Sequence, residues 1–330
     1  MAGQVLQPLD IPSLEKYLQS AVPEIQTPVY VEQQLTAADG KRYVLRKKPP
    51  GQLFSRNSHQ IERKYAIFQA LKQSEVPVPK TYCICLDNTV LGTPFFIMEH
   101  LNGRIFYDST MPGVSVSERS KMWKAAVKML ACIHRLDPNK AVLQYFGKPG
   151  RYYDRQIALL QSLSASYVNV RNIKTKKYVG ELAQRDDQTV IIHGDFKIDN
   201  LVFHKSKPQI IGVLDWEMAT LGHPLADICN LTHPYFWNGL GQNVHLFQTE
   251  QVQVLGLPTR KDCVRWYTEV SGWDPTPYLP WGDVFFMFRT TIIVQSITAR
   301  YARRQASEAQ AKYIQQVKEM KQRRAKLYRL

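Results

Sequence analysis

The feature that most constrains the fold is a set of three short apolar runs that alternate with polar segments inside otherwise helix-like sequence. The runs are Val190–His193, Leu201–Phe203 and Ile210–Leu214. Runs this short, bounded by polar residues and glycine, are typical of buried strands. Asp195, Asn200 and Asp215 stand at or just beyond their ends, so the pattern predicts polar side chains gathered at the edge of a strand core.

These polar residues suit phosphoryl transfer. Asp195 follows a predicted buried strand, so its carboxylate is held by the core and still exposed, and it can accept the proton of a substrate hydroxyl. Asn200 returns five residues later and can bind a metal ion. Asp215 can bridge Mg²⁺ to nucleotide phosphates, with Glu217 as a second metal ligand.

On these residues the chain resembles the aminoglycoside phosphotransferase and choline kinase-like enzymes, distant relatives of the protein kinases. His193-Gly-Asp195 with Asn200 matches their catalytic loop, and Leu214-Asp215-Trp-Glu217 matches their metal-binding segment. The resemblance implies ATP and Mg²⁺ as cofactors, Asp195 as catalytic base and His193 as a brace of the loop. It also places Lys197 near the transferred phosphate, although a solvated surface lysine is an equal alternative.

The resemblance extends into the N-terminal part. Tyr43–Arg46 is similar to the strand whose basic residue grips the α- and β-phosphates, and Glu62 is placed like the helix glutamate that pairs with it. A surface ion pair is the alternative for these two residues. Phe96–Glu99 resembles the hinge that receives adenine through backbone groups, which implies nucleotide contacts at Met98 and Glu99.

Within the family, Val44–Gly51 together with Asp215–Pro224 looks most like the kinase domains attached to acyl-CoA dehydrogenases that process 4-hydroxy acids. The small-molecule hydroxyl substrate is not readable from the sequence; a hydroxyacyl-CoA is one candidate, and the net charge of +15 favours such an anionic acceptor. A choline-like acceptor needs an aromatic and acidic pocket instead. The rings for it, or simply for core packing, are Trp237, Tyr267, Trp273 and Trp281.

The expected architecture is α+β, a bilobal protein-kinase-like fold with a small β-rich N-lobe and a large, mainly helical C-lobe. The boundary falls at the polar linker 99–103, which gives an N-lobe of 1–100 and a C-lobe of 101–330. The expected N-lobe elements are strands at 42–46, 81–85 and 94–98 and an amphipathic helix at 59–71.

One segment departs from the family pattern. Residues 30–43 have room for only one strand and a turn, and Gly40 is their only glycine. The glycine-rich hairpin that covers the nucleotide phosphates is therefore expected to be missing. Because its backbone N–H groups bind those phosphates, a catalytically impaired pseudokinase or ligand-binding protein of the same fold is the alternative to an active kinase.

The remaining features set expectations about environment. Five cysteines without secretory context predict packing roles rather than disulfides, and no signal or membrane span is expected. A cytoplasmic protein is the default, with mitochondrial and peroxisomal locations open. Residues 300–330 hold ten Lys or Arg against two Glu, which predicts a solvated basic helix; nucleic-acid binding is the less favoured alternative. Oligomeric state is not readable from the sequence.

Overall fold

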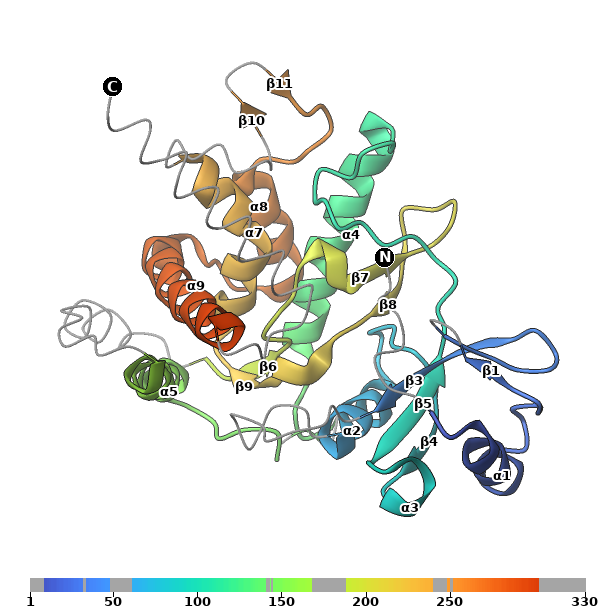
Figure 1. Cartoon of the computed structure of the whole chain (residues 1–330). Helices are drawn as coiled ribbons and strands as arrows, with labels where there is room; N and C mark the ends of the chain where they lie inside the picture. Colours follow the sequence, from blue (N-terminus) through green and yellow to red (C-terminus); the bar gives the residue numbers. More distant parts are fainter. Residues whose placement is uncertain are drawn as a thin grey trace.

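The structure is a computed structural model that describes residues 9–31, 34–47, 61–140, 143, 145–167, 188–239, 248–249 and 252–302. A β-rich N-lobe adjoins a larger C-lobe built mainly of helices (Figure 1). The N-lobe contains α1 (Ile11–Ala21), β1 (Tyr30–Val31), β2 (Leu35–Thr36), β3 (Arg42–Lys47), α2 (Ile61–Leu71), β4 (Thr81–Cys85), α3 (Asn88–Leu91) and β5 (Phe95–Glu99). The C-lobe contains α4 (Val116–Arg135), α5 (Tyr152–Tyr167), β6 (Val190–Ile192), the 3-10 helix η1 (Ile198–Asn200), β7 (Leu201–Phe203), β8 (Ile210–Val213), η2 (Trp216–Met218), β9 (Thr220–Gly222), α7 (Leu225–Gly239), β10 (Gln248–Thr249), β11 (Val252–Gln253), α8 (Arg260–Ser271), η3 (Thr276–Tyr278) and α9 (Leu279–Ala302).

The N-lobe sheet is antiparallel, with the strand order β1-β2-β3-β5-β4. Alternation along β3 sends successive side chains to opposite faces. Tyr43 and Leu45 pack with α1, whereas Val44 packs with α2 and the C-lobe. Arg46 therefore belongs to the face of the sheet that looks toward the C-lobe.

The expectation of a single strand before β3 was wrong. β1 pairs with β2, with Tyr30 opposite Thr36 and Val31 opposite Leu35. Strands of two residues show too few alternations for periodicity to reveal them, which is why the hairpin was missed. The sequence that joins them, Glu32-Gln-Gln34, contains no glycine, and residues 32 and 33 lie outside the described residues.

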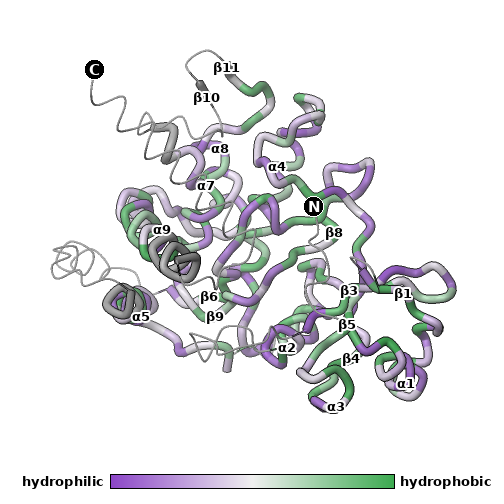
Figure 2. Tube along the Cα trace, viewed as in Figure 1, coloured by the Kyte–Doolittle hydropathy of each residue, from purple (hydrophilic) through white to green (hydrophobic). Residues whose placement is uncertain are grey.

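The two lobes share one hydrophobic core. Phe68 of α2 and Phe96 of β5 belong to the same buried cluster as Trp123 of α4 and Phe203 of β7. The strands β6 to β9 lie at the junction between the lobes (Figure 1), and Figure 2 shows apolar sequence running through β8 and β5. The predicted helix at 59–71 is confirmed over its described part as α2, and the predicted strands at 94–98 and 201–203 are confirmed as β5 and β7.

The three apolar runs form strands as predicted, but one pairing partner was missed. β7 pairs with β8, whereas β6 pairs with β9, a strand of only three residues. All five cysteines are free, as expected. Among the described residues, no helix is both long and apolar enough to cross a bilayer.

Candidate active site

The catalytic loop is tied to buried groups on both sides. The side chain of His193 is fully buried, and its Nε2 lies 2.8 Å from the carbonyl oxygen of Leu214 at the end of β8. The backbone N–H groups of His193 and Gly194 donate to the two carboxylate oxygens of Asp227, at 2.6 and 2.8 Å. The structure thus gives His193 the bracing position that the family resemblance implies.

Asp227 is the buried anchor that sequence reasoning missed. Burial opposes its ionisation, but hydrogen bonds from His134 and from the backbone of His193 outweigh burial and hold the pKa of Asp227 below its usual value. His134 Nε2 lies 3.3 Å from Asp227, and His134 Nδ1 lies 2.8 Å from the hydroxyl of Tyr267. The sequence signal for this anchor is a single aspartate in the first turn of the otherwise apolar helix α7.

Gly194 is required by close packing as well as by its backbone. Its φ of +82° is unfavourable for other residues, and a Cβ there would lie 2.5 Å from the Met218 carbonyl oxygen. Its own carbonyl accepts a hydrogen bond from Arg289 of α9 at 2.9 Å. The backbone at Gly194 therefore packs directly against η2, and this close contact fixes the position of the next residue, Asp195.

Asp195 is oriented by amides and by a lysine. Asn200 Nδ2 donates to its backbone carbonyl at 2.8 Å and to its Oδ2 at 3.1 Å. Lys197 Nζ lies 3.5 Å from Asp195 and 3.3 Å from Asp199. Burial lowers the pKa of Lys197, but the two carboxylates outweigh it and raise that pKa above its usual value, so Lys197 is a fixed cation beside the predicted base.

Asp215 occupies a strained backbone position beside the same site. Its φ of 64° and ψ of 49° are left-handed, a region in which aspartate is tolerated better than most residues. Loss of solvation by the surrounding protein, and then the charge of Glu217, raise the pKa of Asp215. The cations Lys64 and Arg46 lower this pKa, and Asp195 raises it further. Because Leu214 N–H also donates to the Asn200 carbonyl at 2.9 Å, the predicted residues converge on one site.

The donor set suits a hard cation. Asn200, Asp215 and Glu217 offer oxygen atoms, and Mg²⁺ is bound in proteins through one or two carboxylates together with substrate phosphates and water. The like charges that raise the pKa of Asp215 are those that a bound cation would relieve. Among the described residues, no group of three His, Cys, Asp or Glu side chains is arranged to hold a metal ion.

The predicted ion pair between Arg46 and Glu62 is not formed. Both side chains are exposed, and within the described ranges no ion pair joins them. On α2, Glu62 lies on the exposed stripe with Ala66 and Gln69. The opposite side carries Lys64, close to the face of the buried Ile61 and Phe68, because side chains three or four positions apart share a helix face.

On α2 the ion pair is made by Lys64 instead of Glu62, and its partner is Glu217 of the C-lobe instead of Arg46. Lys64 Nζ lies 2.6 Å from Glu217 Oε2, in a pair that is mostly shielded from solvent, with side-chain exposures of 20% and 30%. The neighbouring Arg63 donates to the carbonyls of Phe146 and Ala219 and stacks over the Phe146 ring at 4.5 Å. α2 is thus attached to the C-lobe by two cations.

The predicted hinge residues lie at the end of β5. Met98 is buried, and the Glu99 N–H donates to the Lys80 carbonyl at 2.7 Å, so this N–H is already used. The next residue, His100, was not singled out from sequence, yet its buried Nδ1 has no hydrogen-bond partner among the described residues. Adenine binding at Met98 and Glu99 stays a prediction.

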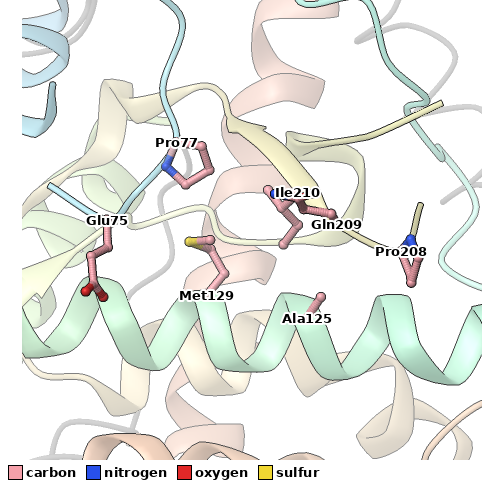
Figure 3. Close-up of a pocket in the computed structure, with 7 residues that line it drawn as sticks. All are labelled: Glu75, Pro77, Ala125, Met129, Pro208, Gln209 and Ile210. Carbon is pink, nitrogen blue, oxygen red and sulfur yellow. The ribbon is translucent and has the colours of Figure 1, made fainter. Parts of the chain in front are cut away.

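Two other groups of residues lie apart from this chemistry. A hollow of about 330 Å³ (Figure 3) is lined by Glu75, Pro77, Ala125, Met129, Pro208, Gln209 and Ile210, none of which is a predicted site residue. Among the rings considered for a choline pocket, Tyr267 is buried and binds His134. Trp281 packs on Tyr153, with ring centres 4.1 Å apart, and the side chain of Trp237 is outside the described residues.

A five-stranded N-lobe, a braced His-Gly-Asp loop and a second aspartate after β8 together define a phosphotransferase with a protein-kinase-like fold. The comparisons with known proteins agree. The chain belongs to the phosphotransferase enzyme family, whose model matches residues 33–255.

Individual relatives show where the likeness lies. Acyl-CoA dehydrogenase family member 11 of Homo sapiens is 35% identical over 266 residues, which is 78% of this chain and 34% of the relative. The chain thus spans about a third of the length of the curated relatives it matches. The crystal structure of a Ralstonia eutropha protein assigned to the aminoglycoside phosphotransferases is similar with a TM-score of 0.76 and 29% identity, over 95% of this chain and 96% of that one.

A more distant likeness shows the fold alone. The GDP complex of aminoglycoside 2'-phosphotransferase-IIIa is similar with a TM-score of 0.57 and 13% identity, over 96% of this chain and 99% of that one.

Proposed function

We propose that this chain is an ATP- and Mg²⁺-dependent kinase that phosphorylates the hydroxyl group of a small molecule. The observation that carries the proposal is the convergence of Asp195, Lys197, Asn200 and Asp215 on one site at the lobe junction. In this reaction the acceptor oxygen attacks the γ-phosphorus, its proton passes to Asp195, and ADP leaves.

Each predicted residue has a role in that reaction. Asp195 is the general base, and Lys197, fixed by two carboxylates, stabilises charge on the transferred phosphoryl group. Asn200, Asp215 and Glu217 would hold Mg²⁺, which supplies charge neutralisation at the phosphates. Arg46 lies on the sheet face toward the C-lobe, close enough to Asp215 to lower its pKa, and is the proposed contact to the nucleotide phosphates.

A hydroxyacyl-CoA is the proposed acceptor. The likeness to acyl-CoA dehydrogenase family member 11 covers 78% of this chain, and the net charge of +15 favours an anionic substrate. The conclusive experiment is a transfer assay with Mg·ATP and three acceptor classes, namely hydroxyacyl-CoAs, choline-type alcohols and aminoglycosides. Phosphorylation of choline or an aminoglycoside in preference to every hydroxyacyl-CoA would overturn the acceptor assignment.

A pseudokinase is the second candidate, favoured by two observations. The connection between β1 and β2 contains no glycine, and Arg46 has no ion pair with Glu62. A thermal-shift titration with Mg·ATP, run beside the transfer assay, separates the two. Stabilisation by nucleotide without transfer to any acceptor is the result expected of a pseudokinase.

A further inference from the structure

Helix α7 places a polar pair beside the catalytic loop that the reaction described above does not use. Asn230 Nδ2 donates to the Phe196 carbonyl at 3.1 Å and lies 3.4 Å from Asp195 Oδ1. One helical turn later, His233 Nδ1 lies 2.6 Å from the backbone oxygen of Asn230. This pair therefore adjoins the predicted base from the C-lobe side.

The tautomer of His233 follows from the residue after it. Pro234 lies inside α7 and has no N–H, so the Asn230 carbonyl lacks the donor that a helix supplies four residues on. A carbonyl only accepts hydrogen bonds, and His233 Nδ1 must therefore carry the proton. In the neutral ring, Nε2 is then the atom with the lone pair.

The surroundings keep this ring neutral and oriented. Burial, the largest influence, lowers the pKa of His233, as does Lys197; the Asn230 carbonyl, Asp199 and Asp195 act in the opposite direction without reversing the shift. The ring stacks on Phe286 of α9, with centres 5.0 Å apart and planes at 25°. Within the described part of the chain, Nε2 has no hydrogen-bond partner, and the residue is only half-buried.

We propose that His233 binds the phosphoryl acceptor by accepting, at Nε2, a hydrogen bond from an uncharged donor of that molecule, a hydroxyl or an amide N–H. This inference rests on the proposed kinase function. The reacting hydroxyl has a single proton, which Asp195 removes, so the donor for His233 is a second group of the acceptor. The Phe286 ring beside His233 adds an apolar surface, which suits a partly apolar acceptor better than a polyamine.

The test uses binding of 4-hydroxybutanoyl-CoA, whose pantetheine arm carries amide N–H groups, measured by calorimetry in the presence of Mg·ADP. His233→Phe keeps the ring stack and removes the acceptor nitrogen. Its Kd should rise about 3- to 10-fold, the usual worth of one neutral hydrogen bond. His233→Gln, whose amide oxygen can accept, should recover part of that loss, and the Kd for Mg·ATP should be the same in all variants.

His204 supplies a matched control, because it lies after β7 and, within the part of the chain that the structure describes, its ring bonds only to the nearby Ser206. His204→Phe should leave the Kd for the acyl-CoA unchanged. An equal Kd in wild type and His233→Phe would overturn the inference. The inference would also be overturned if His233→Phe lost affinity for Mg·ATP as much as for the acyl-CoA, because that would show an effect through Lys197.

A nitrogen-15 NMR measurement of the His233 ring separates this inference from the function it rests on. If wild-type protein binds no 4-hydroxybutanoyl-CoA, the acceptor class is wrong, and the tautomer still decides whether an acceptor nitrogen exists. A protonated Nδ1 with a bare Nε2 supports the inference. A proton on Nε2 overturns it.

Discussion

Two aspartates at the lobe junction differ in almost every physical respect. Asp227 is fully buried, receives hydrogen bonds on both oxygens and has a lowered pKa. Asp215 is exposed, sits on a left-handed backbone and has a raised pKa. The first stabilises the native fold, whereas the second costs stability in the absence of ligands, and this contrast separates support of the loop from the chemistry itself.

The largest expected effect concerns the residue that Asp227 supports. Asp195→Ala should lower kcat about 10²- to 10⁴-fold, the usual cost of losing a positioned general base. The free energy of unfolding should change little, because the carboxylate is partly exposed and the loop is anchored by Asp227. Transfer kinetics and chemical denaturation check both parts. Unchanged turnover would mean that the proton goes elsewhere.

Asp227→Asn should destabilise the fold by about 2 to 4 kcal/mol at pH 7. Both carboxylate oxygens face N–H donors, so an amide must aim its own NH₂ at one of them. The native pKa is lowered, so the stabilisation is complete above the ordinary aspartate pKa and is lost as pH falls through the lower native value.

Urea unfolding at neutral and acid pH tests this prediction. The difference between wild type and Asp227→Asn should shrink in acid. The control Asp137→Asn removes an exposed carboxylate whose hydrogen bond, within the described ranges, is the one from Asn139 N–H, and it should have little effect. Equal stability of Asp227→Asn and wild type at pH 7 would contradict the anchoring role.

The contrast between support and chemistry can be sharpened by comparing the observed Lys64–Glu217 ion pair with the Arg46–Glu62 pair expected from sequence. A double-mutant cycle on Lys64→Met and Glu217→Gln should show a coupling of about 1 kcal/mol in the free energy of unfolding. The matched cycle on Arg46→Met and Glu62→Gln should show none, because those side chains do not meet. A coupling only in the second cycle would restore the pairing expected from sequence.

The smallest expected effect on the free energy of unfolding is a stabilisation, opposite in sign to the effect of Asp227→Asn. Asp215→Asn should raise stability by less than about 1 kcal/mol while it abolishes transfer, since it removes a charge that is opposed first by desolvation and then by Glu217 and Asp195. Because the native pKa of Asp215 is raised, its ionisation costs stability at neutral pH, and wild type should gain as pH falls through that pKa. Differential scanning calorimetry of the metal-free proteins checks this, and a lowered Tm in Asp215→Asn would contradict it.

The sequence was sufficient to predict those helices and strands that are set by the local hydrophobic pattern. The apolar runs before Asp195 and Asp215 are strands, and the amphipathic pattern at 59–71 covers helix α2. These features depend on neighbours along the chain, which periodicity reports directly.

The missed features depend on contacts between distant segments. β1, β2 and β9 have two or three residues each and exist only through their pairing partners. Whether Glu62 or Lys64 faces the C-lobe depends on the rotation of α2, which is set by packing of Phe68. Asp227 is 32 residues from Asp195 and acts through backbone N–H groups, which leave no trace in composition.

The attachment of α2 has a consequence for control. Arg63 donates to two C-lobe carbonyls, and on the other side of the junction Val213 N–H donates to the Pro77 carbonyl at 2.8 Å. An outward swing of α2 would remove both hydrogen bonds from Arg63, at about 1.5 to 3 kcal/mol for each bond to a charged donor, although the Phe146 carbonyl would keep its hydrogen bond from Thr220. These contacts disfavour switching by displacement of this helix, and we expect the rate of transfer to follow the supply of nucleotide and acceptor.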